Sequence, residues 1–122
     1  MRVILVEPNI PPRIAEVENT LKSLQNTVGG YIEVISMDHL DPNIILICNE
    51  EGKIRDLPVN RILYNRYGNA LDYIAGTFMI CAERNGEFVS IPKKLENKYL
   101  ERFASSKVLW DNYQPRRTIH ER

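Results

Sequence analysis

A chain of 122 residues is long enough for one domain whose core needs neither disulfides nor a structural metal. Sixteen basic residues balance sixteen acidic ones, which disfavours a general nucleic-acid coat or a membrane-surface binder, because both need a net basic field. The first apolar run is too short for a signal-peptide core or a membrane span, so we expect a cytoplasmic protein without a membrane partner. Cys48 and Cys81 lie inside apolar runs and are expected to be small core residues.

The amino-terminal part predicts a strand followed by a helix. Residues 2–6 are rich in Val, Ile and Leu, which is typical of a strand buried on both faces. A helix is expected to begin near residues 15–18 and to end at Val28, before Gly29 and Gly30, because glycine reaches the left-handed conformation that ends helices. Its apolar stripe comprises Ile14, Val17, Leu21, Leu24 and Val28.

Further strands are predicted after the two glycines. Residues 31–37 and 44–49, joined by a polar turn, predict an antiparallel hairpin. Residues 59–64 fit either a helical turn or a short strand. A second hairpin pairs residues 77–83 with residues 87–91 around Asn85-Gly86, a dipeptide that tolerates positive φ.

The carboxy-terminal part predicts a second helix and a basic tail. Ser90 is expected to cap this helix, with Pro92 in its first turn and a buried stripe of Leu95, Tyr99 and Phe103. We therefore expect an α+β fold in a single small domain, residues 1–110, with a mainly antiparallel sheet of about five strands packed against two helices. Residues 111–122 are expected to form an exposed basic tail.

Few side chains suggest chemistry. Asp38, His39 and Asp41 fall in a predicted turn, where Asp is favoured for backbone reasons, and their spacing fits no zinc or calcium pattern. The sequence contains no Walker loop, and we predict no metal and no cofactor.

Asn60-Arg61 leaves two interpretations open. Arg61 offers a planar fork suited to carboxylate or phosphate, and Asn60 offers a donor and an acceptor, so the pair could line a ligand cleft. Alternatively, Arg61 pairs with an acidic residue such as Glu33 or Glu50 and fixes its own loop.

The chain resembles an uncharacterised family of small proteins from bacteriophages and bacterial mobile elements, catalogued as domain of unknown function 3846. The resemblance covers about residues 1 to 91 and rests on an ordered series of short motifs. These motifs are MRVILVEP at residues 1–8, VGGYIE at 28–33, CNEEGK at 48–53, LPVNR at 57–61 and IAGTF at 74–78.

The resemblance brings no established activity, but small phage proteins without catalytic motifs often act by binding. We therefore expect a non-catalytic accessory protein of a phage or mobile element that inhibits host anti-phage defence in the host cytoplasm. It would bind a nucleotide-derived small molecule or a host protein. The expected ligand-binding residues are Gly29, Gly30, Tyr31, Glu33, Asn49, Glu50, Asn60, Arg61 and Thr77.

Two other functions remain as alternatives. One is a small enzyme acting on a nucleotide, with Glu33 or Glu50 as general base. The other is a DNA-associated regulator using Arg116 and Arg117, which the zero net charge disfavours. Exposed strand edges also suggest a symmetric homodimer.

Overall fold

The computed structural model describes residues 1–105 of the chain, and the predicted basic tail lies outside them. Within these residues the chain forms eight strands and two helices. In chain order they are β1 (Arg2–Val6), β2 (Arg13–Glu16), α1 (Leu21–Val28), β3 (Ile32–Ser36), β4 (Ile44–Asn49), β5 (Val59–Tyr64), β6 (Ala70–Ala75), β7 (Phe78–Arg84), β8 (Glu87–Val89) and α2 (Lys93–Arg102).

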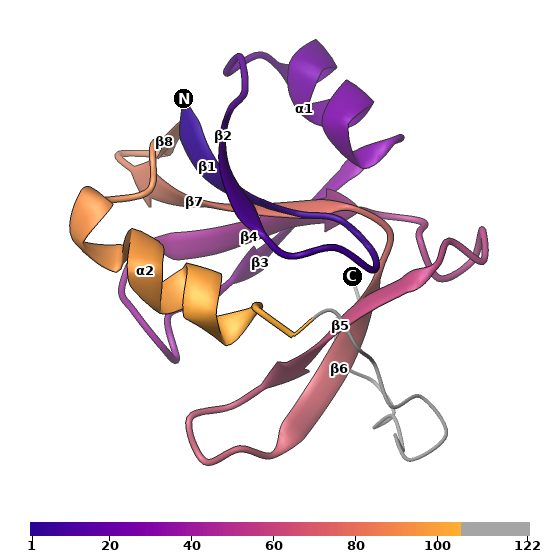
Figure 1. The fold of residues 1–122 in the computed structure, drawn as a ribbon. Coiled ribbons are helices and arrows are strands. Elements are labelled where there is room, and N and C mark those ends of the chain that lie inside the picture. The colour runs from indigo at the N-terminus through magenta and orange to yellow at the C-terminus, as the bar shows by residue number, and fades with distance from the viewer. Residues whose placement is uncertain (106–122) are drawn as a thin grey trace.

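The strands form two antiparallel sheets. The main sheet has the order β2-β1-β7-β4-β3, with β8 also paired to β7, and β5 pairs with β6 in a separate two-stranded sheet. The predicted α+β class is confirmed, with more strands than the five expected. Figure 1 shows α1 on one side of the main sheet, α2 on the other, and the β5–β6 hairpin extending away from both.

Apolar side chains on the two faces of the main sheet form two cores. Leu24 and Val28 of α1 pack on one face with Ile47 and Met79, and Tyr99 and Phe103 pack in the core of the opposite face. Strands β1, β4 and β7 are therefore buried on both faces, as residues 2–6 predicted for β1. Such burial explains their nearly continuous runs of Val, Ile and Leu.

The predicted start of the first helix is wrong. Residues 13–16 form β2, in which Ile14 pairs with Ile4 of β1, and the amide of Val17 donates to the Met1 carbonyl. The helix begins only at Leu21, because the Thr20 side chain accepts from the amide of Ser23 and caps it. Pairing with β1 holds residues 13–17 extended, with alternate residues hydrogen-bonded to β1. Leu21 is exposed, so the apolar stripe of α1 is shorter than predicted.

Two turn predictions are confirmed. Gly29 has φ 84°, and its amide donates to the Gln25 carbonyl as α1 ends. Asn85 and Gly86 have φ values of 53° and 81°, the conformation that a two-residue hairpin needs. The interpretation left open for residues 59–64 resolves as a strand.

The expected cap of the second helix is wrong. Pro92 occupies the N-cap position, and no side chain caps the helix. The Ser90 hydroxyl accepts instead from the amide of Arg2, 2.8 Å away, and so joins β1 to the segment before α2. The hydroxyl is therefore used in a contact between two segments that are distant in the sequence.

Candidate functional site

The structure places the predicted ligand-binding residues in two groups. The first group lies where α1 ends and the β3–β4 hairpin begins, and it contains Gly29, Gly30, Tyr31, Asn49 and Glu50. The side-chain amide nitrogen of Asn49 donates to the Val28 carbonyl (3.2 Å). The side-chain oxygen of Asn49 accepts from the backbone amide of Glu51 (2.7 Å). The amide of Glu50 donates to the Tyr31 carbonyl (2.8 Å).

The Asn49 side chain approaches Gly30 so closely that a larger residue there would have to displace it. A Cβ at Gly30 would lie 2.9 Å from the Asn49 side-chain nitrogen. Glu33 lies further along β3, where its register partner is Cys48. The double glycine is thus a packing position as well as a helix end.

An open groove of about 490 Å³, called here the glycine groove, lies beside this first group. It is lined by Gln25, Asn26, Gly29, Gly30, Tyr31 and Arg55. Tyr31 is 66% exposed and offers a ring face. The Arg55 guanidinium donates to the Glu51 carboxylate at 3.1 Å, so its charge is already partly compensated.

The second group contains Asn60, Arg61 and Thr77 and lies where the β5–β6 hairpin joins the main sheet. Asn60 is fully buried, and its amide donates to the carbonyls of Val6 and Gly76, both at 2.9 Å. Thr77 follows Gly76 and precedes β7. The hydrogen bond from Asn60 to Val6 holds the β5–β6 hairpin against the end of β1.

Arg61 is buried and donates to oxygen atoms of three other residues. Its guanidinium reaches the carbonyls of Phe103 (3.1 Å) and Ile10 (2.8 Å), and the carbonyl and side-chain oxygens of Asn60. These acceptors differ from the Glu33 or Glu50 carboxylate that one interpretation expected. Burial lowers the pKa of Arg61, because removal from water disfavours the charged form.

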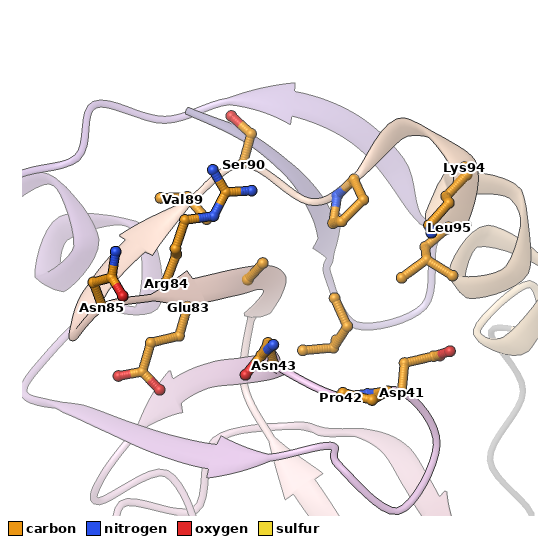
Figure 2. A pocket seen from close by; sticks show the side chains of 13 residues that line it. Asp41, Pro42, Asn43, Glu83, Arg84, Asn85, Val89, Ser90, Lys94 and Leu95 are labelled. Carbon is orange, nitrogen blue, oxygen red and sulfur yellow. The ribbon is translucent and has the colours of Figure 1, made fainter.

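A second groove had no counterpart among the predicted site residues. It has a volume of about 590 Å³ and is called here the α2 groove. Figure 2 shows that its side chains come from the β3–β4 turn, β7, β8 and the start of α2. Ile44, Ala82, Val89 and Leu95 contribute apolar surface, and Asn43, Arg84, Asn85 and Lys94 contribute polar groups.

Among residues 1–105, the positive groups in the α2 groove have no acidic partner. Within residues 1–105, neither Arg84 nor Lys94 forms an ion pair. The first amides of α2 have no side-chain cap and carry the partial positive charge of a helix start. Glu83 also lines the groove, but its side chain leaves β7 in a different direction from that of Arg84 (Figure 2).

The carboxylate of Asp41, also at this groove, is held by α2. It accepts from the Tyr99 hydroxyl (2.7 Å) and lies 2.8 Å from the Lys98 ammonium. Burial opposes its ionisation, but the hydrogen bonds from Lys98 and Tyr99 outweigh burial and lower the pKa of Asp41. Burial and the nearby carboxylate raise the pKa of Tyr99.

Replacing Tyr99 with Phe is expected to destabilise the fold by about 2 kcal/mol, since it removes a hydrogen bond to a charged group. A carboxyl whose pKa is lowered by folding contributes stability above its unfolded pKa, and this contribution is lost as pH falls through the lower folded pKa. The variant should therefore lose less stability than the wild type between neutral and acidic pH. Urea unfolding at several pH values measures the free energy of unfolding of both proteins. An equal dependence on pH in both proteins would contradict the role assigned to the hydroxyl.

Sequence patterns gave no signal for the α2 groove, because its polar residues come from three separate segments. Asn43 follows a turn, Arg84 ends β7 and Lys94 lies in the first turn of α2. Of the sequence patterns, only the Asn85-Gly86 turn, from which the hairpin was correctly predicted, lies at the edge of the α2 groove. Spatial convergence of single residues without a shared motif is visible only in the folded chain.

The two carboxylates among the turn residues considered for a metal, Asp38 and Asp41, have structural partners. Asp38 accepts from the amide of Asn43 at 2.8 Å, and Asp41 is bound to α2. Among the described residues, no group of three His, Cys, Asp or Glu side chains is placed to hold a metal ion. Cys48 and Cys81 are buried, and burial raises the pKa of the Cys81 thiol to about 12.

Comparisons with known proteins give one match. The profile of a family described as Domain of unknown function (DUF3846) matches residues 1–104. No curated protein and no solved structure matches the chain. In residues 1–105, neither helix has the length and apolar character needed to cross a membrane.

Proposed function

Because the chain belongs to the family described as domain of unknown function 3846, which carries no activity with it, we propose a function from the chemistry of its grooves. The protein binds a nucleotide-derived small molecule in the α2 groove without turning it over. In a phage or mobile element, such binding would sequester a signal of host anti-phage defence. Its place of action would be the host cytoplasm.

The observation that carries this proposal is the pair Arg84 and Lys94 beside apolar surface. A nucleotide joins an anionic phosphate to a flat base, so it needs cations and an apolar wall together. Within the described residues neither cation has an acidic partner, and the half-buried Val89 and Leu95 provide part of the wall. The volume of about 590 Å³ lies in the range of small-molecule sites.

The remaining polar groups support binding rather than turnover. Asp41 is held by Lys98 and Tyr99, and its lowered pKa makes it a poor proton acceptor at neutral pH. The Ser90 hydroxyl accepts from the Arg2 amide. Neither group is poised as a base or an activated nucleophile.

Isothermal titration of the pure protein with nucleoside mono- and diphosphates and cyclic dinucleotides tests this proposal. For a probe that binds, the double variant Arg84→Gln and Lys94→Gln is expected to weaken affinity at least about tenfold, because each charge-assisted hydrogen bond contributes about 1.5–3 kcal/mol. Both side chains belong to a surface groove, so the thermal unfolding midpoint should change little.

The matched control is the double variant Tyr31→Ala and Arg55→Gln, which removes the ring and the cation of the glycine groove. It should leave affinity unchanged. Loss of binding in this control alone would move the ligand to the glycine groove. If no probe binds the wild type, the small-molecule proposal is wrong.

A host protein is the second candidate partner, favoured by the turn between β5 and β6. Tyr67 in this turn is 79% exposed and Tyr64 is 42% exposed, on a hairpin that extends away from the main sheet (Figure 1). Exposed tyrosines on a protruding element are typical of protein contacts. Specific capture of one host protein by a chain that binds no nucleotide would favour this candidate.

A further inference from the structure

Strand β3 forms one edge of the main sheet, and its outward backbone groups can be identified. The Met37 amide donates to the Ile44 carbonyl and the Glu50 amide to the Tyr31 carbonyl, so odd-numbered residues face β4. In an antiparallel ladder the intervening residues point their N–H and C=O groups the other way. Ile32, Val34 and Ser36 therefore present theirs at the open edge, where no other described strand pairs with them.

The opposite edge of the same sheet is protected, whereas β3 is not. Strand β2 has four residues, follows Pro11 and Pro12, and carries Arg13 and Glu16. Short length, nearby proline and charge are the features by which proteins prevent edge pairing. β3 is longer, contains no proline and has Glu33 as its one charged residue, and its Val34 is 43% exposed.

We propose that the chain forms a symmetric homodimer in which β3 pairs antiparallel with β3 of a second copy, about a two-fold axis at Val34. Each Ile32 then lies opposite Ser36 of the second copy, and the two Val34 residues lie opposite each other. All three outward-facing positions exchange both backbone hydrogen bonds. The main sheets of the two copies become one continuous sheet.

The charge on β3 selects this arrangement. With the axis at Val34, Glu33 faces Ile35 of the second copy, so the two carboxylates are not opposite each other. Moving the axis to Glu33 would place the two Glu33 side chains directly opposite, where like charges destabilise a strand pair. In the proposed dimer, the exposed Val34 side chain is covered by Val34 of the second copy.

A closed dimer through β3 is favoured over a head-to-tail filament of copies. Pairing β3 with β2 of the next molecule would continue indefinitely, but the protected edge of β2 disfavours it. Pairing β3 with β3 of a second copy occupies both open edges, so the assembly ends at two copies. The strand thus supplies an isologous contact with no other element required.

Sedimentation velocity of the full chain at tens of micromolar tests this inference. The wild type should sediment with twice the 14.2 kDa mass of one chain. Val34→Pro should sediment as a monomer, because proline removes an outward N–H and leaves the hydrogen bonds between β3 and β4 in place. Val34→Lys, which keeps the backbone and places two charges opposite each other, should also be monomeric.

Glu16→Pro is the matched control, because it makes the same change at an outward position of β2. This variant should remain a dimer. Circular dichroism distinguishes a folded monomer from an unfolded chain, and Val34→Lys replaces Val34→Pro if proline unfolds the strand. A monomeric wild type, or a folded Val34→Lys variant that stays dimeric, would overturn the inference, whatever the outcome of nucleotide titration.

Discussion

Replacing Arg61 with Met is expected to lower the free energy of unfolding by about 4 kcal/mol, the largest effect among our predictions. Met retains much of the volume of the side chain but provides no donor. The carbonyls of Phe103 and Ile10 and the side-chain oxygen of Asn60 would each lose a hydrogen bond. An acceptor that is buried without a partner costs about 1–3 kcal/mol. The acceptors of Phe103 and Asn60 are buried, and the Ile10 carbonyl is partly buried.

Urea unfolding followed by circular dichroism measures this effect. Arg61→Lys is the informative comparison, since it keeps the charge but replaces the planar fork with a single ammonium. It should recover only part of the loss, because one ammonium cannot reach acceptors on β5, the loop after β1 and the end of α2. A loss below about 1 kcal/mol in Arg61→Met, the size of one ordinary hydrogen bond, would show that these contacts contribute little.

Replacing Gly52 with Ala is expected to destabilise the fold by about 3 kcal/mol, at the upper end of what overpacking costs. A Cβ at Gly52 would lie 2.5 Å from the Ala75 carbonyl oxygen, where side-chain rotation cannot relieve the clash. The segment after β4 would have to move away from the end of β6. Its Gly52 carbonyl accepts from the Leu57 amide at 3.0 Å, so that turn would be disturbed as well.

Gly30→Ala provides a matched control, because the same methyl group meets a side chain there. The nearest atom is the Asn49 side-chain nitrogen, at 2.9 Å, which can rotate away at the loss of its hydrogen bond to Val28. We expect a loss of about 1 kcal/mol, that of one hydrogen bond. Thermal unfolding of both variants compares them, and equal midpoints would contradict the distinction between backbone and side-chain neighbours.

Local signals predicted several elements well. The buried strand at residues 44–49 has the bounds of β4, because its apolar run stands between turn residues. Gly29 and Asn85-Gly86 were correctly placed in positive-φ turns, since those conformations depend on the residue itself. The stripe of Tyr99 and Phe103 on α2 was also found, because helical periodicity is a property of neighbouring residues.

Residues 13–17 show where local signals fail. Ile14 and Val17 fit the helical period of Leu21 and Leu24, yet this segment pairs with β1 as a strand. Pairing with a distant strand overrode a local periodicity. For residues 59–64 the sequence left a helical turn and a strand open, and pairing with β6 decided for the strand.

The predicted ligand-binding residues do not all lie together in the fold. Gly29, Gly30, Tyr31, Asn49 and Glu50 lie together, because they flank the hairpin that the sequence predicted. Asn60, Arg61 and Thr77 lie apart from them, at the base of the β5–β6 hairpin. Nothing in the sequence indicated that Arg61 would donate to backbone carbonyls, because those carbonyls belong to segments distant in the chain.

The sequence by itself determined the α+β class, the turns at Gly29 and Asn85-Gly86, and the family. The tertiary structure alone decided which strand edges stay open, what Arg61 binds and that Arg84, Lys94 and Asn43 line one groove. The physical reason is how far apart in the sequence the interacting residues lie. Turn and helix preferences act between residues close in the chain. Strand pairing and groove formation depend instead on contacts between distant segments, which exist only once the chain has folded.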